Sequence, residues 1–434
     1  VTKTIPLESS NHQTLSLLER RHKFLGPAYR LFYKDPLHIV RGEGVWLFDS
    51  QGKRYLDMYN NVPHVGHCHP EVVEALQKQI ALLNTHTRYL HENVLDYADR
   101  LLKKLPDDLD VAMFSCTGTE ANELALRIAR AFTGGTGLIV TENAYYGNSH
   151  AIAEISTEDN LPEDRSDYVV TVPNPDIYRG QYRDKNAVEH YVGHVKEAVK
   201  TLHNRGITLA AFIVDTIISS GGIVSPPPEY LKMAADIIQS SGGLFVADEV
   251  QPGFGRTGKH FWGFLADDFL PDIVTMGKPM GNGHPLAATI TKREIIDKFA
   301  DKTSYFNTFG GNPVSCSAGL AVLEILEREN LQKNALDVGT YLIEGIRSIQ
   351  KNCSIIGDVR GSGFFIAVEL VEDRESRNPA TNEAINVVNQ LKSRGILVNT
   401  IGPDNNILKL RPPMVFNYKN ADFFLEEFDQ IMRT

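Results

Sequence analysis

The stretch Leu244-Phe245-Val246-Ala247-Asp248-Glu249-Val250-Gln251 indicates the fold class more directly than any other part of the chain. Four apolar residues in a row end in an acidic pair. Similar short apolar runs recur at 138–140, 210–214, 273–274 and 287–290. Strands buried on both faces have this composition, because helices cover a parallel or mixed sheet from both sides. With helical periodicity over segments such as 71–83 and 120–131, the pattern predicts an α/β protein.

Three regions are expected along the chain. Residues 1–60 form an N-terminal arm, with a helical piece over 14–24, and a small β meander that belongs to the smaller domain. Residues 61–320 form the large domain with the buried strands. Residues 321–434 form a smaller α+β domain, with a strand over 364–370 and a terminal helix.

Composition narrows the functional class. The 434 residues are 42% hydrophobic and 23% charged, which is ordinary for a globular protein, and no apolar run is long enough to span a membrane. A formal charge of −10 argues against a nucleic-acid partner, whose binding comes mainly from neutralising phosphates. The four cysteines are widely spaced, and the first residues lack a secretory pattern, so we expect a cytoplasmic protein.

Asp248 and Lys278 each follow an apolar strand directly. A carboxylate at such a place is costly to bury unpaired, so it needs a cation or strong donors; a cap on the next turn is the alternative. Lys278 lies among glycines and apolar residues, which disfavour the charged amine and lower its pKa, as imine formation requires. An ordinary surface lysine is the alternative that this flanking sequence disfavours.

A turn at residues 116–122 precedes a predicted helix. Gly118 lets the backbone come close to a ligand, Thr119 supplies a hydroxyl, and the helix start presents free N–H groups and a positive dipole end. The turn predicts an anion site or a simple helix cap with equal weight. Tyr145 follows another strand and could cover a flat ring, although an ordinary core aromatic is the simpler interpretation.

Together these residues meet the demands of pyridoxal 5′-phosphate (PLP). That cofactor needs a lysine for a Schiff base, a carboxylate for its pyridine nitrogen, donors for its phosphate and a flat side chain over its ring. The predicted assignments are Lys278, Asp248, the Gly118–Thr119 turn and Tyr145.

The assembled motifs resemble the class III aminotransferases, which are fold-type I PLP enzymes. The resembling segments run from Pro36 to the last helix and include 118–122, 248–251, 253–258, 277–278 and 308–313. The family implies a large domain with a mixed, mostly parallel seven-stranded sheet and a smaller C-terminal domain. It also implies that Gln251 lies near the ring oxygen and that Thr308 reaches the cofactor phosphate of a neighbouring subunit. A homodimer with shared active sites follows, or a tetramer of such dimers.

Within this family the chain is most similar to the phospho-lyases of ethanolamine phosphate and 5-phosphohydroxy-lysine. The similar segments are 60–70, 83–91, 175–180, 274–285 and 408–414. Many class III aminotransferases hold a substrate carboxylate with an arginine where this chain has Lys409, and some keep a gating glutamate where it has Ser220. A lyase would need a second anion site, for which Arg88, Lys409 and Arg411 are the candidates.

Two other functions stay open. The chain could be an aminotransferase for an ω-amino acid or amine with pyruvate as acceptor, or a PLP-fold protein that only binds. The latter would need a missing lysine or an added DNA-binding segment, and the sequence has neither. No metal is expected, because His64, His67 and His69 have a spacing that suits packing better than a zinc site.

Overall fold

The computed structural model describes residues 16–158 and 165–433, and the chain divides into two units at His38–Ile39. The first unit contains helix α1 (Leu17–Phe24), whose N-cap Ser16 exchanges hydrogen bonds with Glu19 in a capping box. The predicted helical piece began at residue 14, which lies outside the described residues. Everything below concerns the second unit.

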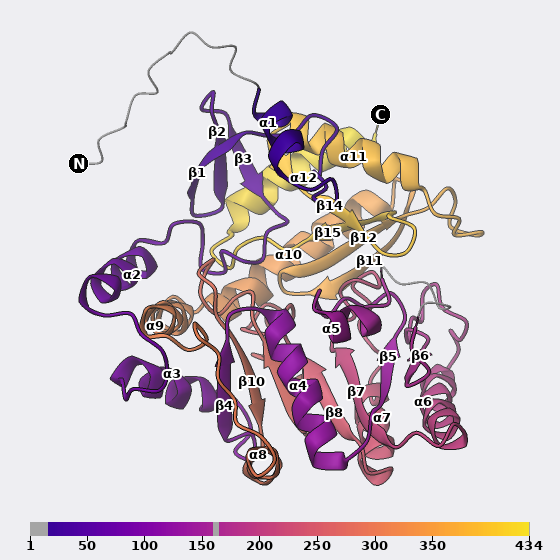
Figure 1. Ribbon diagram of the computed structural model, residues 1–434. Coiled ribbons are helices and arrows are strands. Elements are labelled where there is room, and N and C mark those ends of the chain that lie inside the picture. The colour runs from indigo at the N-terminus through magenta and orange to yellow at the C-terminus, as the bar shows by residue number, and fades with distance from the viewer. Residues whose placement is uncertain (1–15, 159–164, 434) are drawn as a thin grey trace. The chain divides into compact units, whose positions relative to one another are not determined.

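A seven-stranded sheet forms the centre of the second unit (Figure 1). Its order is β4-β10-β9-β8-β7-β5-β6, and all neighbours are parallel except those of β10. The strands are β4 (Val111–Ser115), β5 (Gly137–Thr141), β6 (Val169–Val172), β7 (Leu209–Asp215), β8 (Leu244–Asp248), β9 (Ile273–Met276) and β10 (Ala287–Thr291). The predicted mixed, mostly parallel sheet is confirmed.

Helices that cover the sheet explain why the sequences of these strands are unbroken apolar runs. Helix α4 crosses the sheet and packs on β7 to β10, while α6 and α7 pack against each other and on β5 to β8. Every residue of β5, β7, β8, β9 and β10 is buried as a result. The helices up to the end of this sheet are α2 (Pro70–Leu82), α3 (Glu92–Leu102), α4 (Gly118–Thr133), α5 (His150–Ile155), α6 (Ala187–Asn204), α7 (Tyr230–Ser240), the 3-10 turn η2 (Gly263–Ala266) and α8 (Arg293–Ala300).

The predicted meander is present as β1 (Ile39–Glu43), β2 (Trp46–Asp49) and β3 (Arg54–Asp57). Strand β3 also pairs in parallel with β13 (Ile396–Leu397), far along the chain. The N-terminal meander is therefore joined by hydrogen bonds to the C-terminal region. The division into domains at residues 60 and 320 stays a prediction.

The C-terminal region holds a second, antiparallel sheet of order β11-β12-β15-β14. Its strands are β11 (Ile356–Ser362), β12 (Phe365–Leu370), β14 (Asn399–Ile401) and β15 (Ile407–Leu410). Its helices are α9 (Pro313–Arg328), α10 (Leu331–Gln350), α11 (Thr381–Ser393) and α12 (Tyr418–Met432). Helix α9 begins at Pro313 because Asn312 caps it and Pro313 occupies its first turn. Among the described helices, none has the length and apolar character that a membrane crossing requires.

Candidate active site

The turn between β4 and α4 is built as an anion site. Thr117 caps the helix, accepting from the Glu120 amide at 3.1 Å, and the Glu120 carboxylate accepts from the Thr117 amide at 3.0 Å. The amides of Gly118 and Thr119, in the first helical turn, have no acceptor within the described part of the chain. A side chain at position 118 would meet Val250 at 3.1 Å, so glycine is what lets this turn approach the neighbouring strand end.

Asp248 ends β8 and is almost completely buried. One carboxylate oxygen accepts from Asn122 Nδ2 at 2.9 Å and the other from the Val250 amide at 2.9 Å. Burial, and then the negative charge of Asp215, raise the pKa of Asp248 to about 7. A cation placed against this carboxylate would therefore be stabilised strongly, because it would remove the cost of the buried charge.

Lys278 follows β9 and is only partly exposed. Burial and the nearby charge of Arg411 lower the pKa of Lys278, against the opposing attraction of Asp248 and Asp215. Its amine makes no hydrogen bond or ion pair with any described residue. An amine that is easily deprotonated and has no partner is suited to a nucleophile or a base.

These groups surround one pocket of about 220 Å³, which we call the catalytic pocket. Its lining is Gly118, Thr119, Asn122, Tyr145, Tyr146, Asp215, Asp248, Val250, Gln251 and Lys278. The structure thus brings together all the predicted cofactor residues except Thr308.

Sequence reasoning did not select Asn122 or Asp215 as site residues. Asn122 lies on the buried side of α4 and is held by the Thr275 hydroxyl at 2.6 Å, so that its amide is aimed at Asp248. Asp215 ends β7 and is the register partner of Asp248 on β8. The sequence could have pointed to Asp215, because Asp215 ends an apolar run just as Asp248 does. The two runs form neighbouring parallel strands.

Lys409 and Arg411 form a cationic wall beside the catalytic pocket. Both are buried, and Arg411 donates to the side-chain oxygen of Gln251, which lines the pocket. Burial, with the like charges of Arg411 and Lys278, lowers the pKa of Lys409 well below its usual value. Arg411 Nε is buried without a hydrogen-bond partner in the described chain. Asp215 attracts both side chains, but no described carboxylate forms an ion pair with either, so this wall is receptive to an anion.

Arg88 and Thr308 do not line the pocket of their own chain, and both are exposed. The Arg88 guanidinium lies over the ring of Phe306, 3.8 Å from its centre. The segments of Arg88 and Phe306 also expose four large apolar side chains, those of Tyr89, Leu90, Phe306 and Phe309, which we call the apolar surface; Leu90 is 95% exposed. Such a surface is typical of a face that meets another protein chain.

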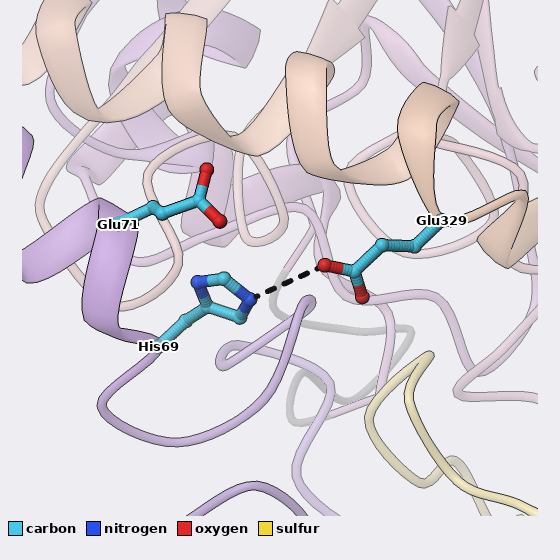
Figure 2. A group of neighbouring side chains, drawn as sticks. All are labelled: His69, Glu71 and Glu329. Carbon is cyan, nitrogen blue, oxygen red and sulfur yellow. Dashed lines mark ion pairs between the residues drawn. The ribbon is translucent and has the colours of Figure 1, made fainter.

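The three histidines named in the sequence have separate partners. His64 contacts the Phe254 carbonyl and Arg256, and His67 binds Asp57 at 2.8 Å. His69 lies with Glu71 and Glu329, as Figure 2 shows, and its Nε2 is 3.7 Å from a Glu329 oxygen.

Arg328 forms ion pairs with both carboxylates of this last group. It donates two hydrogen bonds to Glu71, at 2.7 and 2.6 Å, and one to Glu329 at 3.2 Å. One guanidinium thus offsets one of the two negative charges, and the group forms an ion-pair cluster between α2 and α9.

Comparison with known proteins identifies the family. The model of the class III aminotransferases, "Aminotransferase class-III", matches residues 32–432. A Drosophila melanogaster protein named alanine–glyoxylate aminotransferase 2-like is 44% identical over 98% of this chain and 87% of its own. A Caenorhabditis elegans protein named ethanolamine-phosphate phospho-lyase homolog 1 is 40% identical over 96% of this chain and 93% of its own.

Among solved structures, a phospholyase from Arthrobacter in complex with phosphoethanolamine superposes with a TM-score of 0.94. It is 41% identical, over 96% of this chain and 100% of that one. The resemblance read from the motifs is thereby confirmed over nearly the whole chain. This protein belongs to the class III aminotransferase family, whose enzymes use pyridoxal 5′-phosphate.

Proposed function

We propose that this protein is a PLP-dependent phospho-lyase, which eliminates phosphate and ammonia from a phosphorylated amino alcohol. The favoured substrate is ethanolamine phosphate, and the products are acetaldehyde, ammonia and phosphate. The observation that carries the proposal is the likeness, over 96% of this chain, to the Arthrobacter phospholyase in complex with phosphoethanolamine. The cationic wall of Lys409 and Arg411 beside the catalytic pocket supplies groups that would hold the substrate phosphate. The wall comes from β15 and the residue after it, whereas the Gly118–Thr119 amides begin α4, so the site would offer anions two places, as a phosphorylated substrate on a phosphorylated cofactor requires.

The residues of the pocket fit the cofactor. The free amides of Gly118 and Thr119 would hold its phosphate, Asp248 its protonated ring nitrogen and Tyr145 one face of its ring. Lys278 would carry it covalently. When bound, the cofactor supplies an electron sink for the carbon that bears the substrate's nitrogen.

The chain's own groups would then direct the reaction. Lys278, with its lowered pKa, would take the proton from the carbon bearing nitrogen. Lys409 and Arg411 would hold the phosphate on the next carbon and stabilise the charge that grows on its oxygen as it leaves. Ser220, where some aminotransferases have a gating glutamate, leaves no carboxylate there to neutralise these cations.

A second chain would complete the site. The exposed Thr308 and Arg88 lie on or beside the surface of Tyr89, Leu90, Phe306 and Phe309, which a homodimer would cover. In such a dimer Thr308 would reach the partner's cofactor phosphate. Arg88 would serve as a substrate residue only through the partner's pocket, because it lies outside its own.

The second candidate is an aminotransferase for an ω-amino acid or amine. The identity of 44% to the Drosophila alanine–glyoxylate aminotransferase 2-like protein favours it. A carboxylate could also bind to Lys409 and Arg411, so these residues alone do not choose between an acidic and a phosphorylated substrate.

One assay separates the two functions. The holoenzyme is incubated with ethanolamine phosphate and no oxo acid, and phosphate and acetaldehyde are measured; the proposal expects both in equal amounts. A Lys409→Gln variant should lose most of this activity through a higher KM, whereas Lys259→Gln, at an exposed lysine, serves as the control. No phosphate release, with amino transfer from an amine to pyruvate, would replace the lyase by the aminotransferase.

A further inference from the structure

Arg256 is a fully buried arginine that does not line the catalytic pocket, although it belongs to the loop after β8 that also carries Gln251. Among the described residues, its guanidinium donates only to carbonyl oxygens and a histidine. Burial, and then the like charge of Arg411, lower the pKa of Arg256 to about 9, although Asp57 attracts it. A cation buried without a carboxylate in contact is costly, so its place in the fold calls for an explanation.

The Arg256 guanidinium joins three segments that lie far apart in the sequence. Its Nη1 donates to the Pro412 carbonyl at 2.8 Å and to the Phe364 carbonyl at 3.3 Å, and its Nη2 lies 3.0 Å from His64 Nδ1. Pro412 directly follows Arg411, a residue of the cationic wall. Arg256 therefore fixes the backbone at the position where Arg411 enters the site.

His64 can accept from Arg256 in only one protonation state. Its Nε2 lies 2.8 Å from the Phe254 carbonyl, which can only accept, while its Nδ1 faces a guanidinium, which can only donate. The proton is therefore on Nε2, and Nδ1 presents a lone pair. The ring is neutral, which agrees with burial and the Arg256 charge lowering the pKa of His64 well below its usual value.

The contacts of Arg256 and His64 return to the catalytic pocket through Arg411. The Arg411 side chain donates to Gln251, which lines the pocket and lies in the same loop as Arg256. His64 holds the chain beyond Arg411 as well, because its carbonyl accepts from the Met414 amide at 2.7 Å. Arg411 is thus secured through its side chain and through the backbone that follows it.

We propose that Arg256, oriented by the neutral His64, is a positioning residue that fixes the Arg411 guanidinium for the phosphate of the substrate. The inference rests on the proposed function, because that function assigns a phosphate to the cationic wall. Arginine binds phosphate through a planar fork, so binding depends on the angle of the guanidinium as well as on its distance. A fork that is held in place beforehand avoids the cost of ordering a long side chain on binding.

The test is calorimetric titration of the holoenzyme with inorganic phosphate, which requires no turnover. Arg411→Gln should weaken the phosphate Kd about tenfold and so assign the binding to the cationic wall. His64→Leu removes the acceptor of Arg256 and should also weaken it about tenfold. His64→Gln restores one donor and one acceptor, so its Kd should stay within about threefold of the parent. His203→Leu, at an exposed histidine of α6, is the control.

A double substitution separates positioning from general damage. In the Arg411→Gln background, His64→Leu should change the phosphate Kd less than about twofold, because the residue that His64 helps to position is gone. Losses that multiply would overturn the proposal, and so would a parental Kd in His64→Leu. PLP affinity, measured alongside, should stay within about twofold of the parent in each variant.

Arg256→Lys asks the same question if His64→Leu does not fold. It keeps the charge but not the planar fork, so phosphate should bind at least about threefold more weakly. A parental Kd in the folded variant would overturn the proposal.

Failure of the proposed function would give a different result. A parent enzyme that releases no phosphate from ethanolamine phosphate, yet shows this pattern of phosphate Kd values, would reject the lyase and keep Arg256 as the positioning residue of an anion site. A parent holoenzyme that binds no inorganic phosphate, or binds it equally well after Arg411→Gln, would overturn the role of Arg256.

Discussion

Asp215 and Asp248 end neighbouring parallel strands as register partners, so two carboxylates stand side by side at the base of the catalytic pocket. Asp215 accepts hydrogen bonds from the Ser219 amide, at 3.0 Å, and the Ser219 hydroxyl, while Asp248 is held by Asn122. Their repulsion helps to raise the pKa of Asp248 to about 7. The pair therefore tunes how strongly the pocket holds a cation near neutral pH.

The first prediction concerns this repulsion. Asp215→Asn should lower the pKa of Asp248, so that its carboxylate is ionised at lower pH. Affinity of the apoenzyme for PLP should rise with pH through about 7 in the parent, and at a lower pH in the variant. PLP titrations between pH 5 and 9 test this, with Asp236→Asn, at an exposed aspartate of α7, as the control. Superimposable profiles for Asp215→Asn and the parent would contradict it.

The second prediction concerns the covalent link. After borohydride reduction, PLP should remain attached to the peptide that contains Lys278, because the nitrogen of that residue carries the cofactor. Lys278→Ala should lose the attachment, whereas Lys259→Ala should keep it. Mass spectrometry of the digested protein reads this out without any assay of turnover. Attachment to another peptide would reject the assignment.

The third prediction concerns the buried charge of Lys409. Its folded-state pKa lies below the unfolded value, so the penalty is fully present below the folded pKa and fades as pH rises toward the unfolded value. Lys409→Met should remove this penalty and stabilise the apoenzyme at pH 7 by about 1–4 kcal/mol. It should also weaken competitive inhibition by inorganic phosphate. Urea unfolding at pH 7 and 10 provides the test, with a smaller gain expected at pH 10. A loss of stability would show that Lys409 is paired.

The fourth prediction concerns Glu369, which is fully buried between two arginines. Arg179 lies in the segment after β6 of the large sheet and donates to Glu369. Arg360, on β11, also donates to the Gly222 carbonyl at 2.6 Å. Glu369→Gln should destabilise the protein by about 3–5 kcal/mol, since it leaves Arg179 without an ion pair and leaves the buried Arg360 with Asp358 alone. Asp358→Asn, at a more exposed partner of Arg360, should cost less in the same urea unfolding series. Equal losses would mean that burial is not what makes Glu369 important.

The fifth prediction concerns self-association. Leu90→Lys and Phe309→Glu place charge on the exposed apolar surface and should convert a dimer to monomers. They should also weaken PLP binding, because Thr308 would no longer reach a second chain. Ile385→Lys, at an exposed position of α11, should leave the dimer intact. Sedimentation analysis of the holoenzymes gives the answer, and dimers that persist in both variants would place the interface elsewhere.

Much of the fold could be predicted, because a strand buried on both faces has an unbroken apolar sequence. Asp248 and Lys278 could be predicted as site residues because each is a charged residue at or just after the end of such a strand. The reversed direction of β10 could not, since its residues, 287–291, read like those of a parallel strand. Arg88 was chosen from a segment likeness, and nothing local says that its guanidinium lies over Phe306 outside the pocket. The contact of Asn122 with Asp248 could not be predicted either, because only the tertiary fold brings α4 against the end of β8.

Asp215 lines the catalytic pocket, and Gly221, in the segment that follows, lines a second pocket of about 300 Å³. This shared segment gives the occupants of the two pockets a route to act on each other. If a guest on one side shifts this segment and changes the affinity on the other by some factor, the second guest must change the affinity for the first by the same factor.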